Sequence, residues 1–311
     1  AKNKGLGLLF QQFNFINGTQ AATVLAIPPG VGAQRPLGET HRIGSLQDFQ
    51  RRNGCGRDGG IAMAQAIAIG MGLHQSRTTD IGAIAKTCGY DWLFIDMEHS
   101  ALDIGNASMI ASAALPVGIS PLVRVPGKEH HHASRILDNG AQGIVVPHVN
   151  SPEEAARAVS YCKYPPVGHR SVAGAQPQFR FQSVPLGEAT RIVNAETLVI
   201  VMVETPEAIE QVDAIAAVPG IDVVLIGTND LCGEMGIPGQ FADPRVEEAY
   251  RKVIAACKKH GKHPGMGGVY EPKLMEKYIG MGMRFILSGS DLSFIMAGGR
   301  ERTSFLNACK L

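Results

Sequence analysis

Apolar runs and amphipathic segments alternate along the chain from about residue 66 onward. Two of the runs, residues 198–203 and 223–226, contain only apolar side chains, and a segment with helical spacing lies between them. A strand that is apolar throughout is buried on both faces, which is typical of a parallel sheet. The pattern therefore predicts strand, helix, strand, with Glu204 and Asp230 following the two strands.

The same alternation predicts eight strands in all. Their expected ranges are 66–73, 92–96, 121–125, 143–149, 198–203, 223–226, 264–269 and 284–287. Helices are expected at 79–88, 103–114, a segment ending at 138, a segment opening at 151, 206–215, 243–260 and 272–279, with a long loop at 164–184. Eight strands alternating with helices over about 230 residues indicate an α/β fold of the (β/α)8 TIM-barrel type. A doubly wound open sheet is the alternative, but no GxGxxG motif opens a helix after the first strand.

The remaining segments are assigned from their composition. Residues 1–60 are rich in Gly, Gln and Asn and show no sustained periodicity of apolar residues. This composition predicts an irregular N-terminal extension. Residues 61–311 are expected to form one barrel domain that includes a C-terminal helix. That helix is expected over residues 291–311, with a break near Gly298 and Gly299 because glycine is a poor helix former.

Composition narrows the class of protein. The 311 residues carry a net charge of +1, so no basic surface for nucleic acid is predicted. The six cysteines include no CxxC pair, which indicates reduced thiols in an intracellular, cytoplasmic protein. The apolar runs are too short to span a bilayer, so no membrane partner is expected.

Charged side chains follow several of the predicted strands. Glu204 and Asp230 follow the fifth and sixth strands, Arg124 lies in the third, and Asp96 and His99 lie at the end of the second. The C-terminal ends of barrel strands meet at one mouth, where ligands bind. Two converging carboxylates are costly unless a cation lies between them, and their oxygens favour a hard divalent ion such as Mg²⁺.

This set of residue types is suited to enolate chemistry. A divalent ion polarises a 2-keto acid, an arginine stabilises the enolate oxygen, and an Asp beside a His raises the basicity of the imidazole. Each residue alone also has an ordinary structural interpretation, such as a salt bridge for Arg124 or a rim charge for Glu98. His148, which ends the fourth strand, is interpreted as a structural hydrogen-bonding residue and is left out of the set.

Longer motifs give the chain a family resemblance. The motifs are DWLFIDMEHS, PLVRVP, RILDNGAQGIVVPHV, KYPPVGHRS, VMVETPEAIEQVDAIAAVPGIDVVLIGTNDL and GIPGQF, in this order between residues 91 and 241. With them the chain resembles the HpcH/HpaI aldolases, which are class II, metal-dependent pyruvate aldolases, and among these the macrophomate synthase branch. The resemblance implies a TIM barrel that acts as a carbon–carbon lyase through a pyruvate enolate. The implied reactions are cleavage or formation of 2-keto-4-hydroxy acids and decarboxylation of oxaloacetate.

The resemblance also implies roles for single residues. Glu204 and Asp230 would hold Mg²⁺, or else Mn²⁺, Co²⁺ or another divalent ion. Backbone N–H groups around Gly227 and Asn229 would hold the carboxylate of pyruvate. Arg124 would stabilise the enolate.

Further roles implied by the resemblance concern proton transfer and assembly. Asp96 and His99 would form an acid–base dyad, and Asp138 would reach the site of a neighbouring subunit. The family assembles as hexamers, often with the last helix swapped between subunits, so a homo-oligomer is expected. The small-molecule partners would be pyruvate or oxaloacetate and an aldehyde or other acceptor.

Three departures from the family pattern leave the acceptor open. Met202 stands where bacterial members often carry Gln, residues 72–76 lack an aromatic residue found in some relatives, and residues 168–174 lack the usual Gly-rich form. Two other functions also stay open. One is a citryl- or malyl-thioester lyase, and the other is a non-catalytic barrel that binds 2-keto acids.

Overall fold

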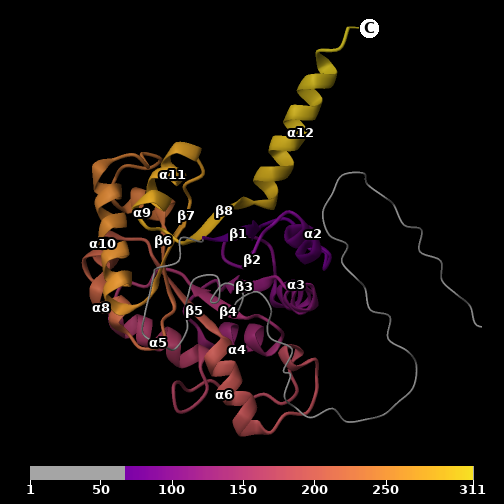
Figure 1. Cartoon of the computed structure of the whole chain (residues 1–311), viewed down its shortest axis with the longest axis vertical. Coiled ribbons are helices and arrows are strands. Elements are labelled where there is room, and N and C mark those ends of the chain that lie inside the picture. Colours follow the sequence, from indigo (N-terminus) through magenta and orange to yellow (C-terminus); the bar gives the residue numbers. More distant parts are fainter. Residues whose placement is uncertain (1–66, 311) are drawn as a thin grey trace, which may run out of the picture. The chain divides into compact units, whose positions relative to one another are not determined.

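The computed structural model describes residues 67–310, and the extension expected over residues 1–60 lies outside them. The described residues form a closed barrel of eight parallel strands in chain order, which confirms the TIM barrel (Figure 1). The strands are β1 (Ala68–Leu73), β2 (Trp92–Asp96), β3 (Ser120–Arg124), β4 (Gly143–Val146), β5 (Leu198–Val203), β6 (Val223–Gly227), β7 (His263–Gly267) and β8 (Phe285–Ser290).

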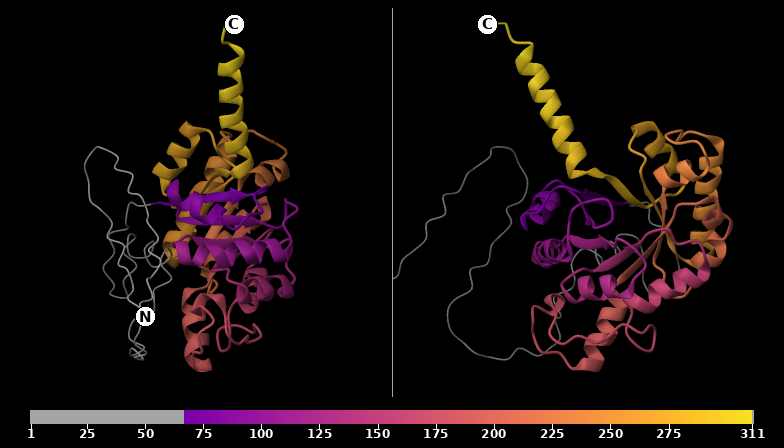
Figure 2. Two further views of the ribbon diagram at one scale, coloured as in Figure 1. Left: turned by 90° about the vertical axis from the view of Figure 1, so that its right-hand side faces the viewer. Right: turned by 180° about the vertical axis from the view of Figure 1, so that it is seen from behind.

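Helices connect the strands and cover the outside of the barrel (Figures 1 and 2). They are α2 (Ile81–Thr87), α3 (Ile104–Val117), α4 (His130–Asp138), α5 (Pro152–Cys162), η1 (Pro177–Phe179), α6 (Leu186–Glu196), α7 (Pro206–Glu210), α8 (Val212–Ala217), α9 (Thr228–Glu234), α10 (Pro244–His260), α11 (Pro272–Met281) and α12 (Asp291–Asn307). Several begin where the sequence predicts: Ser151 caps α5 and Asp243 caps α10 through their side chains.

Alternate side chains of the strands fill the barrel interior. Trp92 stacks on Phe285 with ring centroids 4.1 Å apart. Gly70 makes room for this pair, because a Cβ there would lie 2.2 Å from the Trp92 ring. Side chains alternate along a strand, so Asp96 faces the same way as Trp92 and Phe94 and lies above them at the mouth.

Strand register brings the sequence-predicted site residues together. Asp96 on β2 is paired with Arg124 on β3. Val203 on β5 is paired with Ile226 on β6, so Glu204 and Gly227, the next residue on each strand path, are neighbours. The fold therefore gathers residues from four strands at one mouth.

Three helical segments differ from the sequence-based expectation. The helix α6, directly before β5, was not anticipated, and the single helix expected over 206–215 is the pair α7 and α8. The break expected near Gly298 and Gly299 is wrong, because α12 is continuous. It leaves the end of β8 and extends away from the barrel (Figures 1 and 2). Within residues 67–310, no helix is long and apolar enough to cross a membrane.

Candidate active site

Two carboxylates lie where β5 and β6 end. The Glu204 side chain is 1% exposed, and its Oε2 accepts the backbone N–H of His148 at 2.8 Å. Its Oε1 has no hydrogen-bond partner in the described part of the chain. Burial, reinforced by the negative charge of Asp230 in the first turn of α9, raises the pKa of Glu204 to about 7. A buried carboxylate oxygen without a partner is a feature that a bound cation would satisfy.

The backbone beside Glu204 leaves space around this oxygen. A Cβ on Gly227 would lie 2.1 Å from Glu204 Oε1, so a side chain at this position would displace the carboxylate. Helix α9 begins at the next residue, and its N-cap, Gly227, provides no side chain to cap the first N–H groups. Asn229 in this turn is exposed. Uncapped N–H groups at a helix start are suited to a carboxylate, so this turn can accept an anionic substrate.

The carboxylates of Glu204 and Asp230 could supply part of the ligand set of a metal ion. Within residues 67–310, no group of three or more His, Cys, Asp or Glu side chains is placed to hold a metal. Glu204 and Asp230 are thus a set of two carboxylates. Mg²⁺ is usually bound by one or two carboxylates, with water and substrate as its other ligands. The residues present therefore fit a hard divalent ion at an open site rather than a closed structural site.

Arg124 at the end of β3 is held by two carboxylates. Its Nε and Nη2 donate to Asp96 Oδ1 and Oδ2 at 2.9 and 2.6 Å, and its Nη1 lies 2.9 Å from Glu98 Oε2. Burial alone would raise the pKa of Asp96, but hydrogen bonds from His74 and Arg124 hold it well below its usual range. These contacts use three of the five N–H groups of the guanidinium, which leaves two for a substrate.

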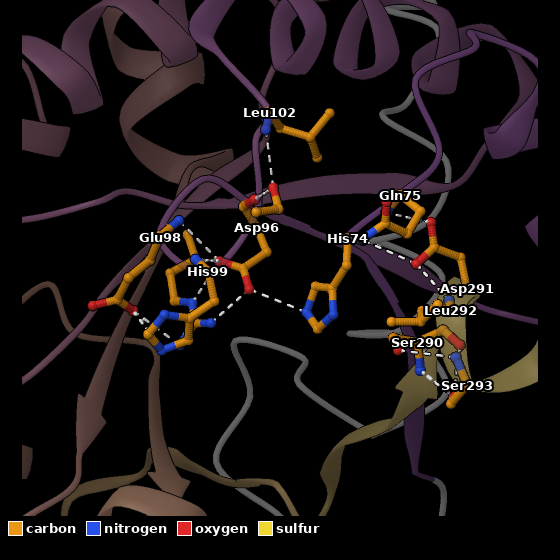
Figure 3. A network of polar contacts seen from close by, with 12 residues as sticks. His74, Gln75, Asp96, Glu98, His99, Leu102, Ser290, Asp291, Leu292 and Ser293 are labelled. Carbon is orange, nitrogen blue, oxygen red and sulfur yellow. Dashed lines mark hydrogen bonds and ion pairs between the residues drawn. The ribbon is translucent and has the colours of Figure 1, made fainter.

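The histidine that contacts Asp96 through its ring is His74, not His99. His74 Nε2 lies 3.1 Å from Asp96 Oδ2, and Figure 3 shows the two side chains facing each other. His99 gives Asp96 only its backbone N–H, while its ring lies 4.0 Å from Glu98 Oε2. Sequence reasoning missed His74. The signal that could have found it is position, since His74 directly follows β1 as Glu204 directly follows β5.

His148, which was set aside on sequence grounds, lies between two carboxylates. Its Nδ1 is 3.4 Å from Glu204 Oε2, and its Nε2 is 3.7 Å from Glu98 Oε1. Its φ of 52° is in the left-handed region, which is uncommon for a residue other than glycine. This backbone conformation accompanies the hydrogen bond from His148 N–H to Glu204. His148 therefore belongs to the surroundings of the carboxylate pair.

Asp138 does not lie at this mouth. It is the last residue of α4, which runs from the mouth back to the start of β4. Its Oδ1 is 2.6 Å from Arg170 Nη2 and 3.4 Å from Gln176 Nε2. Its contribution to the site of a neighbouring subunit stays a prediction.

Known proteins resemble this chain over most of residues 67–310. The family model described as HpcH/HpaI aldolase/citrate lyase matches residues 73–297. The 4-hydroxy-4-methyl-2-oxoglutarate aldolase of Hapsidospora irregularis is 41% identical over 222 residues, which cover 70% of this chain and 82% of that protein. A 4-hydroxy-4-methyl-2-oxoglutarate aldolase of Chaetomium globosum is 38% identical over 238 residues, which cover 75% of this chain and 88% of that protein.

Solved structures show the same architecture. An HpcH/HpaI aldolase from Desulfitobacterium hafniense superposes with a TM-score of 0.75 at 30% identity, covering 79% of this chain and 95% of that one. Macrophomate synthase superposes with a TM-score of 0.66 at 26% identity, covering 78% and 87%.

Proposed function

The chain belongs to the HpcH/HpaI aldolase/citrate lyase family, and from this premise we propose that it is a divalent-metal-dependent carbon–carbon lyase. The reaction passes through the enolate of pyruvate. It is the cleavage or formation of a 4-hydroxy-2-keto acid, or the decarboxylation of oxaloacetate. The observation that carries the proposal is the buried Glu204 carboxylate, whose unpartnered oxygen lies in one barrel mouth with Asp230 and Arg124.

The carboxylate pair would hold the ion, and the neighbouring turn would orient the substrate. Glu204 and Asp230 would be its two protein ligands. When bound, a divalent ion supplies the positive charge that polarises the 2-keto group of the substrate. The N–H groups around Gly227 and Asn229 would hold the carboxylate of the 2-keto acid, because no side chain occupies them.

Arg124 would stabilise the negative charge that develops on the substrate oxygen. Burial disfavours its charged form, but pairing with Asp96 and Glu98 more than offsets this and raises its pKa. The guanidinium group of Arg124 is held in place by these two carboxylates before the substrate binds. A donor fixed in advance needs no reorganisation during the reaction, which is the source of its catalytic effect.

The first substrate to test follows from two relatives of the chain. Both are 4-hydroxy-4-methyl-2-oxoglutarate aldolases. Cleavage of this compound between C3 and C4 gives two molecules of pyruvate, which lactate dehydrogenase reports through NADH oxidation. We expect cleavage with Mg²⁺, Mn²⁺ or Co²⁺ and none after chelation.

A matched pair of variants tests the site. Glu204→Ala should lower the rate by at least ~10²-fold, because it removes a ligand of the ion. Glu210→Ala is the control, since Glu210 is exposed and forms an ion pair with Lys252 on the outer surface of the described barrel. Full activity after chelation, or an equal effect of the two substitutions, would contradict the proposed site.

We also propose that the protein is a homo-oligomer, with the family's hexamer as the expected form. Helix α12 carries several large apolar side chains in contact with solvent. These are Leu292, Phe294, Ile295, Met296, Phe305 and Leu306, which are 39–64% exposed. A second copy of the chain would cover them, as expected for a helix exchanged between subunits.

A further inference from the structure

An aromatic side chain enters the barrel mouth from the wall opposite Arg124. Tyr270 lies in the loop between β7 and α11. The barrel is closed in chain order, so β7 lies across it from β3, the strand that ends in Arg124. Loops that follow the strands of this fold line the mouth, where ligands bind. Tyr270 is therefore a mouth residue that the sequence-based set of site residues does not contain.

The charges that act on Tyr270 show where its phenol lies. Burial raises the pKa of Tyr270, and a hydrogen bond from the backbone of Gly268 lowers it. The positive charge of Arg124 lowers this pKa further, and the negative charge of Asp96 raises it. These two charges lie at the ends of β3 and β2, and neither strand is a neighbour of β7. Since the effect of a charge falls off with distance, the phenol extends over the opening toward them.

The backbone beside Tyr270 contacts the turn that is proposed to hold the substrate carboxylate. Gly267 on β7 is paired with Gly227 on β6. A Cβ on Gly268 would lie 3.2 Å from the backbone nitrogen of Asn229, so no side chain separates the two loops. The Tyr270 hydroxyl accepts a hydrogen bond from this same glycine. It therefore lies beside the turn, and its own proton is available to another acceptor.

This position suits the part of the substrate beyond C3. The turn and Arg124 are proposed to act on the 2-keto acid half, and the phenol of Tyr270 lies over the space between them. In 4-hydroxy-4-methyl-2-oxoglutarate the other half carries a methyl group and a second carboxylate, C5. A phenol offers an apolar ring to the methyl group and an O–H donor to the carboxylate. Tyr270 is 48% exposed, so its side chain has free surface for a ligand.

We infer that Tyr270 is a specificity residue, whose hydroxyl donates a hydrogen bond to the second carboxylate of the substrate. The inference rests on the proposed lyase function and narrows its substrate class. The preferred substrates are 4-hydroxy-2-keto acids that release a second keto acid rather than a simple aldehyde. Tyr270 takes part in no bond making or breaking, so its effect is confined to binding and orientation of this half.

Two substrates that differ in this carboxylate test the role. 4-Hydroxy-4-methyl-2-oxoglutarate has the C5 carboxylate, and 4-hydroxy-2-oxopentanoate has a methyl group there. Both release pyruvate, which lactate dehydrogenase reports. Tyr270→Phe keeps the ring and removes only the hydroxyl. We expect kcat/KM for the dicarboxylate to fall about 10- to 100-fold, as for a lost hydrogen bond to a charged group, with a much smaller loss for the monocarboxylate.

The readout is the ratio of the two kcat/KM values. Tyr161→Phe is the matched control, because Tyr161 lies in α5 on the outside of the barrel, with its ring 6.0 Å from that of His130. An unchanged ratio in Tyr270→Phe overturns the inference, even if both rates fall, because equal losses indicate a structural role. An equal change of the ratio in Tyr161→Phe also overturns it. If the unmodified protein cleaves neither substrate with any divalent ion, the proposed function itself fails.

Discussion

At the scale of single residues, the two inward carboxylates of the mouth have opposite environments. Asp96 receives donors from every side, and its pKa lies well below the usual range. Glu204 keeps one oxygen without a partner, and burial raises its pKa to about 7. Environments that separate the pKa values of neighbouring acids are typical of catalytic sites. Asp96 serves as a fixed anion beside Arg124 and His74, whereas a bound cation would favour the ionised form of Glu204.

Substitution of Arg124 tests its action on developing charge. A lysine retains the positive charge but cannot donate to both Asp96 oxygens and Glu98 at once. We expect Arg124→Lys to lower kcat for cleavage by ~10²-fold or more, with a much smaller change in KM. Steady-state kinetics with 4-hydroxy-4-methyl-2-oxoglutarate measure both constants. An unchanged kcat would remove Arg124 from the mechanism.

The shifted pKa of Glu204 predicts a pH-dependent stability without metal. The folded-state pKa of about 7 lies above the ordinary value of 4.5, so the folded protein binds more protons between these pH values. This contribution to stability is present below pH 4.5 and is lost as the pH rises through 7. Glutamine cannot ionise, so Glu204→Gln with chelator should be more stable than the unmodified protein at pH 8, by up to about 3 kcal/mol.

Urea unfolding with EDTA at several pH values measures this difference. The advantage of Glu204→Gln should vanish below pH 4.5, where the glutamate becomes protonated in both the folded and the unfolded state. Added Mg²⁺ should stabilise only the unmodified protein, because only it retains both ligands. A Glu204→Gln variant that is the less stable protein at pH 8 with EDTA would contradict the assigned environment.

At the scale of elements, the turn from β6 into α9 shapes the candidate metal site. Gly227 lies against Glu204 Oε1, where a Cβ would come within 2.1 Å. Gly227→Ala should push the carboxylate aside and weaken metal binding ~10- to 100-fold, the range seen when groups that orient a ligand are changed. Titration calorimetry with Mn²⁺ measures it. Gly187→Ala in α6 is the control, because a Cβ there meets no atom within 4 Å. Equal affinity in the two variants would contradict this account.

The sequence predicted the elements best where burial alone determines them. β2 and β5 have the expected bounds. In both, a continuous apolar run lies between charged or turn residues, so the ends of the strand are well defined in the sequence. Helix α6 was missed because it has only one buried residue, Val193, and so lacks a strong apolar stripe. The unbroken α12 shows that two glycines do not end a helix whose start is fixed by a capping box at Ser290.

The candidate site was predictable only in part, for a related reason. Residues at strand ends, such as Glu204 and Arg124, follow from the strand assignment and the barrel topology. The partner of Asp96 does not, because it depends on where the loop after β1 lies. That loop is fixed by Asp291, which is 217 residues away from His74 in the sequence. A sequence pattern within one segment cannot predict a contact between residues so far apart in the chain.

At the scale of the whole molecule, α12 is the helix whose apolar side chains are left uncovered by the rest of residues 67–310. After Asp291 all of its residues are exposed, including Ile295 at 64% and Phe305 at 63%. We expect light scattering after size exclusion to give a mass several times that of one chain. Ile295→Asp with Phe305→Asp should shift the protein to smaller species, since charges cannot be buried cheaply at an apolar interface. A monomeric unmodified protein would contradict the proposed assembly.

The central claim is that the mouth formed by Glu204, Asp230 and Arg124 generates the enolate of pyruvate. Exchange of the pyruvate methyl protons with deuterated water tests it most directly, because exchange requires the enolate and no acceptor. With Mg²⁺ or Mn²⁺, proton NMR should show the methyl signal decaying in the presence of the protein. Chelator or Glu204→Ala should stop the decay. A methyl signal that persists with every divalent ion tested, in a correctly folded preparation, would contradict the account.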